Sequence, residues 1–443
     1  MIVTGKGLGL KGLSRNIGAT FARQVIAALL NLITTVIIAR VYGPEGNGAF
    51  AIALLLPSML ATFLNLGVAP ANVYHLGSQQ MTVRELLGAN LRIFLLLGTL
   101  GVVLGAGVLI WKAEHFFPGV DPFILWFALA VFPLSLLNGF LHSVFQGLQQ
   151  FRHYNVLAII LPSIVLVLVV GLTLFGSREL ALLIGAQVVS QLFVLGLTIR
   201  WLVPLLGEKT SGKTSAHIIT KTLGYGWKAH LSNILAFVNY KADIFLANLF
   251  LGPAAVGIYV IAVALAEKLW LISQAVSTVL LPRLAQLSSD EAKRKQLTPL
   301  VARWVLTVTL LGALAVAAIA GPLIGSLFGA DYSDALIPLW ILLPGIVLMS
   351  ASRVLANDIA ARGRPELNMY TAMVVVAVNV AGNLILIPLY GLTGAAAATT
   401  IAYLLNVVLR LIIYGRFTDN RWYDSVFVRA SDFRMIRSAV RSL

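Results

Sequence analysis

The residues best suited to chemistry in this 443-residue sequence are ionisable side chains that stand inside long apolar stretches. A charge near the centre of a bilayer costs about 2.5–3.5 kcal/mol even on the lenient insertion scale, so such residues usually line a water-filled path. An arginine there can hold a phosphate, because its guanidinium donates two parallel hydrogen bonds. A carboxylate there can hold a proton or a metal cation. The residues in question are Arg23, Asp243, Glu267 and Arg353.

Arg23 belongs to a polar stripe on a predicted helix over residues 16–40. Asn31 and Thr34 follow it at helical spacing, so the three side chains share one helix face. A shift of 209 residues lays this stripe on a second one that contains Ser232, Tyr240 and Asp243. The helices that follow carry similar stripes, with Asn65 in the first and with Glu267 and Gln274 in the second. We therefore expect four helices to turn polar faces toward a cavity.

The same shift aligns two copies of a local motif. It lays GPEGNGAFAIA (Gly43–Ala53) over GPAAVGIYVIA (Gly252–Ala262), which share Gly-Pro, a later Gly, an aromatic residue and Ile-Ala. A second alignment, of Phe132-Pro133 with Leu343-Pro344, places His142 over Arg353, and we add both to the predicted cavity residues. A period this long indicates a duplicated half and not a solenoid repeat.

The composition is that of a membrane protein. Hydrophobic residues make up 59% of the chain and charged residues 11%. Apolar runs repeatedly reach the twenty residues that a bilayer about 30 Å thick requires. There is no cysteine, so neither a disulfide framework nor a thiolate metal site is available. We predict an all-α polytopic membrane protein with twelve helices, at 16–40, 47–76, 86–110, 122–146, 154–175, 180–203, 226–250, 253–281, 302–328, 335–360, 367–389 and 392–415.

The distribution of charge predicts how these helices cross the membrane. A net charge of +15 can indicate nucleic-acid binding, but here nearly all Lys and Arg between the predicted helices fall on one side. The opposite side has Arg40, Lys112 and Arg178. The positive-inside rule then places both termini in the cytoplasm. Six helices per half give two parallel repeats around a central cavity. We expect a first lobe at 1–206, a cytoplasmic loop at 207–224, a second lobe at 225–416 and a basic tail at 417–443.

Two phosphate-binding patterns lack the fold that each requires. Gly7–Gly12 matches GxGxxG, and Gly207–Thr214 matches the Walker A pattern, but neither has the strands of a nucleotide-binding site around it. No argument for direct use of ATP remains. We predict no catalytic residue, no metal site and no cofactor, with coupling to an H⁺ or Na⁺ gradient through Asp243 and Glu267.

Several of these features together resemble a known family. The duplicated halves, Gly43-Pro44 to Phe50, and NLILIPLYGLTGAAAAT (Asn383–Thr399) are similar to the polysaccharide transporter, or Wzx-type flippase, branch of the multidrug/oligosaccharidyl-lipid/polysaccharide (MOP) exporter superfamily. The resemblance implies a V-shaped bundle that flips an undecaprenyl-diphosphate-linked oligosaccharide across the bacterial cytoplasmic membrane by alternating access. It implies diphosphate binding by basic cavity residues, a pattern that Arg23 and Arg353 match. It also implies a role in surface polysaccharide or exopolysaccharide synthesis, with a polymerase and a chain-length protein as partners.

Two other functions compete with this interpretation. A cation-coupled exporter of small organic cations, from the multidrug branch, would explain Asp243 and Glu267. A membrane-embedded polymerase or glycosyltransferase would need an ordered loop outside the membrane that carries acids or arginines. The longest predicted outside loops, near Trp111–Asp121 and Gly329–Asp334, are too small for that. We therefore predict a transporter and not an enzyme.

Overall fold

The computed structural model describes residues 10–206, 215–287, 290–429 and 432, and every regular element among them is a helix. The chain divides into two compact units. Unit 1 holds Met1–Phe237 and Leu251–Gly257, and unit 2 holds Val238–Phe250 and Ile258–Leu443. The Walker A-like segment and residues 433–443 of the tail lie outside the described residues, and the GxGxxG-like segment lies partly outside them.

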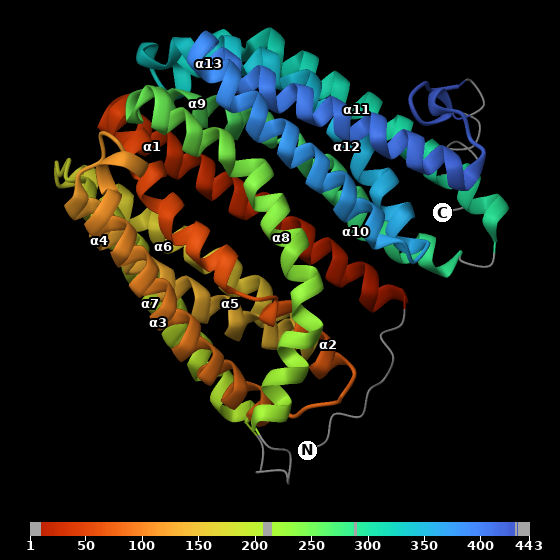
Figure 1. Cartoon of the computed structure of the whole chain (residues 1–443), viewed down its shortest axis with the longest axis horizontal. Coiled ribbons are helices and arrows are strands. Elements are labelled where there is room, and N and C mark those ends of the chain that lie inside the picture. The colour runs from red at the N-terminus through yellow and green to blue at the C-terminus, as the bar shows by residue number, and fades with distance from the viewer. Residues whose placement is uncertain (1–9, 207–214, 288–289, 430–431, 433–443) are drawn as a thin grey trace. The chain divides into compact units, whose positions relative to one another are not determined.

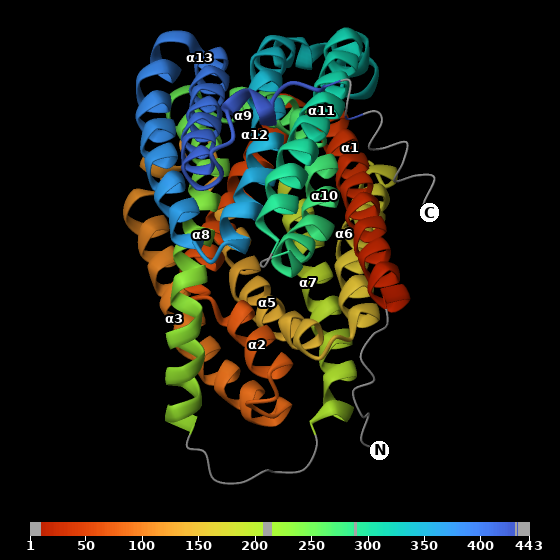
Figure 2. The same ribbon diagram turned by 90° about the vertical axis from the view of Figure 1, so that its right-hand side faces the viewer.

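Each unit is a set of packed helices (Figures 1 and 2). Unit 1 contains α1 (Leu10–Leu64), α2 (Val68–Gly77), α3 (Val83–Phe116), α4 (Pro122–Leu129), α5 (Val131–Gly147), α6 (Phe151–Leu174), α7 (Leu180–Leu202), η1 (Val203–Leu205) and the first parts of α8 (Ser215–Leu251) and α9 (Pro253–Glu267). Unit 2 contains residues 238–250 of α8, the rest of α9, α10 (Trp270–Gln286), α11 (Glu291–Leu327), η2 (Ala330–Ala335), α12 (Leu336–Ala361), α13 (Pro365–Thr418) and η3 (Trp422–Ser425). In unit 2, α12 packs against α10, α11 and α13.

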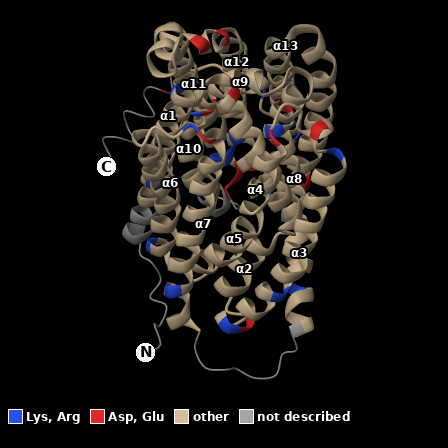
Figure 3. Ribbon diagram, turned by 90° about the vertical axis from the view of Figure 1, so that its left-hand side faces the viewer, with Lys and Arg blue, Asp and Glu red and all other residues tan. Residues whose placement is uncertain are grey.

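The helices confirm the predicted class of an all-α membrane protein. Among the described residues, nine helices are long and apolar enough to cross a membrane, or ten if the pair α9 and α10, bent by 44°, forms one span. Charged residues are sparse along them (Figure 3). Three of the nine, α1, α3 and α13, each join two helices across a residue with non-helical backbone angles, Gly43, Lys112 and Gly391. The exact count of twelve and the two parallel repeats stay predictions.

The two Gly-Pro pairs of the repeated motif stand at breaks in the helices. Gly43 and Gly252 both have positive φ, 67° and 81°, a conformation that glycine adopts without a Cβ clash. A proline follows each of them, and its fixed φ suits the first turn of a helix. The sequence motif therefore marks the end of one helix and the start of the next.

The two copies of this motif also contact each other within unit 1. A Cβ atom on Gly48 would stand 1.7 Å from the carbonyl oxygen of Pro253, and one on Gly257 would stand 1.8 Å from that of Pro44. Asn47 Nδ2 donates to the Gly257 carbonyl oxygen at 3.0 Å. Gly48 and Gly257, and likewise Pro44 and Pro253, differ by 209 residues, the offset of the sequence alignment. The contact is therefore reciprocal, and it depends on the missing side chains.

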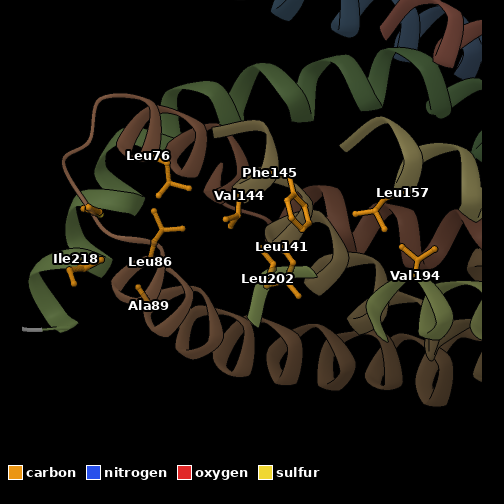
Figure 4. Close-up of a cluster of buried hydrophobic side chains, with 11 residues drawn as sticks. Leu76, Leu86, Ala89, Leu141, Val144, Phe145, Leu157, Val194, Leu202 and Ile218 are labelled. Atoms are coloured by element: carbon orange, nitrogen blue, oxygen red, sulfur yellow. The ribbon is translucent and has the colours of Figure 1, made fainter. Parts of the chain in front are cut away.

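A cluster of buried apolar side chains holds unit 1 together (Figure 4). It joins α2, α3, α5, α6, α7 and the start of α8. Because lipid tails are as apolar as these side chains, the hydrophobic effect does not favour the cluster in a membrane, and close packing stabilises it. Its members are Leu76, Met81, Leu86, Ala89, Leu141, Val144, Phe145, Leu157, Val194, Leu202 and Ile218. A matching cluster in unit 2 joins α10, α11, α12 and α13 through Leu280, Leu284, Ala302, Val305, Val354, Leu355 and Tyr414.

A buried ion pair anchors the segment after α13 to α11. Arg303 Nε donates to Asp432 Oδ2 at 2.5 Å, and its Nη1 donates to the Asp424 carbonyl oxygen at 2.7 Å. Burial alone would raise the pKa of Asp432, but hydrogen bonds from Arg303 and from the Arg429 backbone N–H bring that pKa below its ordinary value. The charged form of Asp432 thus helps to hold this segment on α11.

Candidate functional site

The most elaborate polar cluster of unit 2 surrounds Arg353 on α12. Its guanidinium carbon lies 4.2 Å from the centre of the Trp270 ring, and its Nη2 donates to Tyr240 Oη at 3.3 Å. Tyr240 and Trp270 are in ring contact at 5.2 Å, and Trp270 and Tyr403 at 5.8 Å. Four helices, α8, α10, α12 and α13, therefore meet at one arginine. A desolvated cation–π contact contributes about 2 kcal/mol, enough to hold the guanidinium in place.

No carboxylate within the described part of unit 2 forms an ion pair with Arg353. Asp358, 0% exposed on the same helix, shows the contrast. It accepts from Arg362 Nε at 2.6 Å, and Arg294 Nε lies 3.4 Å from its other oxygen. Arg362 also pairs with Glu291 at 2.8 Å, so the two carboxylates balance the charges of Arg294 and Arg362, as structural ion pairs do. Within the described residues of unit 2, the Arg353 guanidinium has aromatic and hydroxyl contacts and no ion pair, although Glu267 is near enough to interact with it electrostatically, so it can still bond to a ligand.

A second arginine lies next to this cluster. Arg410 on α13 is buried, and its Nη1 donates to the carbonyl oxygen and to Oγ of Ser352, at 3.2 and 3.1 Å. Ser352 Oγ in turn donates to Asn406 Oδ1 at 2.7 Å. Arg410 belongs to the predicted helix over residues 392–415, and in the structure it lies on α13. Neutral hydrogen-bond partners make its burial tolerable.

Asp243 on α8 is a buried carboxylate that neutral donors hold. One oxygen accepts from the Ile244 backbone N–H at 2.8 Å, and the other accepts from Tyr259 Oη at 2.8 Å and Thr399 Oγ1 at 3.3 Å. No ion pair reaches it within the described residues of unit 2. Asn379 donates to Thr399 Oγ1 at 3.5 Å, and Asn383 donates to Asn379. Hydroxyl, amide and carboxylate oxygens in one place suit a proton or a hard monovalent cation.

Glu267 and Gln274 extend this region toward the bend between α9 and α10. Glu267 is the last residue of α9 and is partly buried. The charged side chains near enough to act on it electrostatically are Lys241, Asp243, Lys268 and Arg353. Gln274 is partly buried one turn after Trp270. Of the predicted site residues, Tyr240, Asp243, Glu267 and Arg353 thus share one neighbourhood. No group of three His, Cys, Asp or Glu in the described residues could hold a metal ion.

The remaining predicted residues belong to unit 1. The guanidinium carbon of Arg23 on α1 lies 5.5 Å from the centre of the Tyr154 ring on α6. Its buried Nε has no hydrogen-bond partner among the described residues. His142 on α5 is half-buried, and its buried Nε2 likewise lacks a described partner. Arg23 thus repeats, in looser form, the arrangement of Arg353 against aromatic rings.

Four other predicted residues of unit 1 have different surroundings. Thr34 is buried, and its hydroxyl donates to the Leu30 carbonyl oxygen within the same helix at 2.9 Å. Asn65 Nδ2 donates to the Thr62 carbonyl oxygen, and its Oδ1 accepts from the Gly67 N–H, both at 2.9 Å, which stabilises the break between α1 and α2. Asn31 and Ser232 are exposed. The polar groups of Thr34 and Asn65 thus bond within their own segment.

Sequence reasoning missed five residues of the unit 2 cluster: Tyr259, Trp270, Thr399, Tyr403 and Arg410. A signal for three of them was present. Thr399, Tyr403, Asn406 and Arg410 recur at intervals of four, three and four, the spacing of one helix face. Tyr259 is the aromatic residue of the repeated motif, and its hydroxyl bond to Asp243 depends on tertiary packing. No sequence signal identified Trp270.

The chain has relatives among known proteins. The profile of a family described as polysaccharide biosynthesis protein matches residues 37–337. The chain is 25% identical over 198 residues to a probable low-salt glycan biosynthesis flippase, Agl15, of Haloferax volcanii, covering 44% of this chain and 42% of that protein. It is 23% identical over 415 residues to the capsular polysaccharide biosynthesis protein CapF of Staphylococcus aureus, covering 91% and 99%. The chain therefore spans under half of the first relative and nearly all of the second.

Solved structures share the fold. The lipid II flippase MurJ, in an inward closed conformation, superimposes with a TM-score of 0.71 at 16% identity, covering 89% of this chain and 87% of that one. An inward-facing multidrug resistance transporter of the MATE family, in the MOP superfamily, gives a TM-score of 0.65 at 16% identity, covering 90% and 97%. The chain therefore has the fold that a lipid flippase and a multidrug transporter share.

Proposed function

The chain belongs to the family of polysaccharide biosynthesis proteins, and on that premise we propose that it flips a lipid-linked oligosaccharide across the cytoplasmic membrane of a bacterium. The cargo would be an oligosaccharide on a polyprenyl diphosphate, moved from the cytoplasmic to the outer leaflet by alternating access. The flippase and polysaccharide names of its relatives and the MOP fold support this proposal. A polysaccharide polymerase and a chain-length protein would act on the flipped product. Both termini would lie in the cytoplasm.

The observation that carries the proposal is the state of Arg353. Trp270 and Tyr240 hold its guanidinium without neutralising it, whereas Arg294 and Arg362 form ion pairs with Asp358, and Arg362 also with Glu291. An intramembrane cation without an ion pair is stabilised by an anionic partner that offsets its burial. A diphosphate supplies one, because its oxygens accept the paired guanidinium hydrogen bonds. Arg23 in unit 1, also placed against an aromatic ring, offers a second cation.

Export of organic cations is the second candidate, and Asp243 is what favours it. A buried carboxylate without a cationic partner is the group that such exporters need. In this unit, however, Arg353 lies near Glu267 and Arg410 lies near Arg353, and two arginines repel a cationic cargo. We assign Asp243, with Glu267, to the coupling ion, H⁺ or Na⁺, and Arg353 to the cargo. Energy would then come from an ion gradient.

Binding measurements test this division. Purified protein and its Arg353→Ala and Arg353→Lys variants are titrated with undecaprenyl diphosphate, with undecanol as an uncharged apolar control and with a lipophilic organic cation. Charge-assisted hydrogen bonds contribute about 1.5–3 kcal/mol, so Arg353→Ala should weaken diphosphate binding roughly 10- to 100-fold. Arg353→Lys should retain part of it, because charge survives without the paired geometry. Arg92→Ala, an exposed arginine of α3, is the matched control. Tight binding of the organic cation with none of the diphosphate would contradict the proposal.

A further inference from the structure

The end of α13 and the segment after it enclose a groove in unit 2. Its volume is about 550 Å³, within the range of ligand sites. Five of its lining residues recur at intervals of three and four along α13 and so share one helix face. The lining residues are Val408, Leu411, Ile412, Gly415, Arg416, Asn420 and Trp422. We infer that this groove binds one anionic glycerophospholipid, with an acyl chain along α13 and the phosphate at Arg416.

The inner part of the groove suits an acyl chain. Val408 and Ile412 are 43% and 50% exposed, although they lie in a helix apolar enough to span a membrane. Apolar side chains that are exposed in such a span face lipid. Gly415 deepens the groove, because a Cβ there would meet nothing nearer than the Asn420 carbonyl oxygen at 3.4 Å. A hydrocarbon chain can therefore lie against this face.

The outer rim suits a phosphate. Arg416 is exposed in the last turn of α13, and no described carboxylate forms an ion pair with it. Of the other charges nearby, Lys295 pairs with Asp419 at 3.5 Å and Arg429 pairs with Asp424, while the Arg421 guanidinium donates to Tyr423 Oη at 2.5 Å. The charge of Arg416 is therefore available to a lipid head group.

Aromatic side chains place this rim at the membrane surface. Trp422 and Phe427 are each 59% exposed, and their rings lie 6.1 Å apart. Exposed tryptophans collect at the level of the head groups, where an apolar ring and a polar N–H are both accommodated. Arg416 thus stands where acyl chains end and phosphates begin. A basic residue in that position contributes about 1 kcal/mol toward an anionic lipid, which sets it apart from a zwitterionic one.

Native mass spectrometry of the detergent-solubilised full chain tests the inference. Phosphatidylglycerol and phosphatidylcholine with the same acyl chains are offered in equal amounts, and the ratio of bound lipids is recorded. The wild-type chain should favour phosphatidylglycerol, and Arg416→Gln should lower that preference roughly fivefold. Gly415→Leu should reduce binding of both lipids, because the side chain fills the groove. Arg92→Gln, which removes the same charge from an exposed position on α3, should leave the ratio unchanged.

Several results would overturn the inference. One is a wild-type chain that does not prefer phosphatidylglycerol, and another is an unchanged ratio in Arg416→Gln. An equal loss in Arg92→Gln would show a general effect of charge. If Arg416→Gln does not elute as a single species, Gly415→Leu tests the groove instead, and unchanged binding of both lipids to that variant would overturn the inference. A photo-crosslinking residue in place of Val408 identifies the occupant directly: labelled phospholipid supports the site, whereas labelled residues 433–443 of the chain itself would refute it.

Discussion

The reciprocal glycine contact between α1 and α9 predicts a sharp response to a single methyl group. Gly48→Ala would place a Cβ atom 1.7 Å from the Pro253 carbonyl oxygen, where an ordinary contact is 3.4 Å or more. The two backbones would have to separate by roughly 1.7 Å at this point, half of an ordinary contact distance. That displacement would also break the bond of 3.0 Å from Asn47 to Gly257.

The cost follows from these two losses. Overpacking of a close contact costs typically 1–3 kcal/mol, and a lost hydrogen bond adds about 0.5–1.5 kcal/mol. The total of roughly 2–4 kcal/mol should lower the thermal midpoint of the detergent-solubilised protein by roughly 5–10 °C. Gly107→Ala on α3 is the control, because a Cβ there meets no atom within 4 Å. It should leave the midpoint unchanged or raise it slightly.

A double variant sharpens the test. Gly48→Ala and Gly257→Ala act on one contact, so their combined effect should be clearly smaller than the sum of the two single effects. If Gly48→Ala is as stable as the wild-type chain, or if the two effects simply add, the reciprocal contact does not hold these helices together.

Three further predictions concern the charged groups. Asp243→Asn keeps the shape of the carboxylate and removes its charge. Na⁺ or low pH should therefore raise the thermal midpoint of the wild type and not that of the variant, and an equal response of both would exclude Asp243 as the ion site. Asp358→Asn leaves Arg294 and Arg362 without their shared carboxylate and should destabilise the protein by about 3–5 kcal/mol, whereas Glu366→Gln, at an exposed pair, should have little effect in the same thermal assay. The folded-state pKa of Asp432 lies below its ordinary value, so its pair with Arg303 stabilises the chain above the unfolded-state pKa and is lost as the pH falls through the folded-state pKa. Pepsin should therefore cut residues 419–429 of the wild type faster at the lowest pH, and those of Arg303→Gln faster at every pH. A cleavage rate that is the same under both changes would contradict this prediction.

Much of the fold follows from local physics that a sequence displays. Apolar runs of span length predict the helices. Gly43-Pro44 predicts a break, because glycine adopts the positive φ that ends one helix and proline suits the first turn of the next. The helical spacing of Tyr240 and Asp243 was enough to predict that both lie on one polar helix face. These features depend on residues close to one another in the chain.

The rest depends on contacts between distant helices. Trp270 becomes part of the site only because α10 brings its ring over Arg353 of α12, a neighbour 83 positions away. Arg410 was not recognised as part of the cluster because the sequence cannot show that Ser352 accepts its hydrogen bonds. Thr34 and Asn65 lie on the predicted stripe, but local backbone groups take up their polar atoms. Spacing thus identifies a polar face, and packing decides which of its residues are available.

Translocation in proteoliposomes tests the central claim most directly. A fluorescent oligosaccharide on undecaprenyl diphosphate is placed in both leaflets, and a membrane-impermeant quencher reports the fraction that remains exposed over time. The wild-type chain should move this lipid between leaflets in an imposed ion gradient. Arg353→Ala and Arg23→Ala should be folded and inactive, and Arg92→Ala should be active. Movement of an organic cation without movement of the lipid-linked sugar, or full activity of Arg353→Ala, would contradict the proposal that this chain flips a diphosphate-linked glycan held by Arg353.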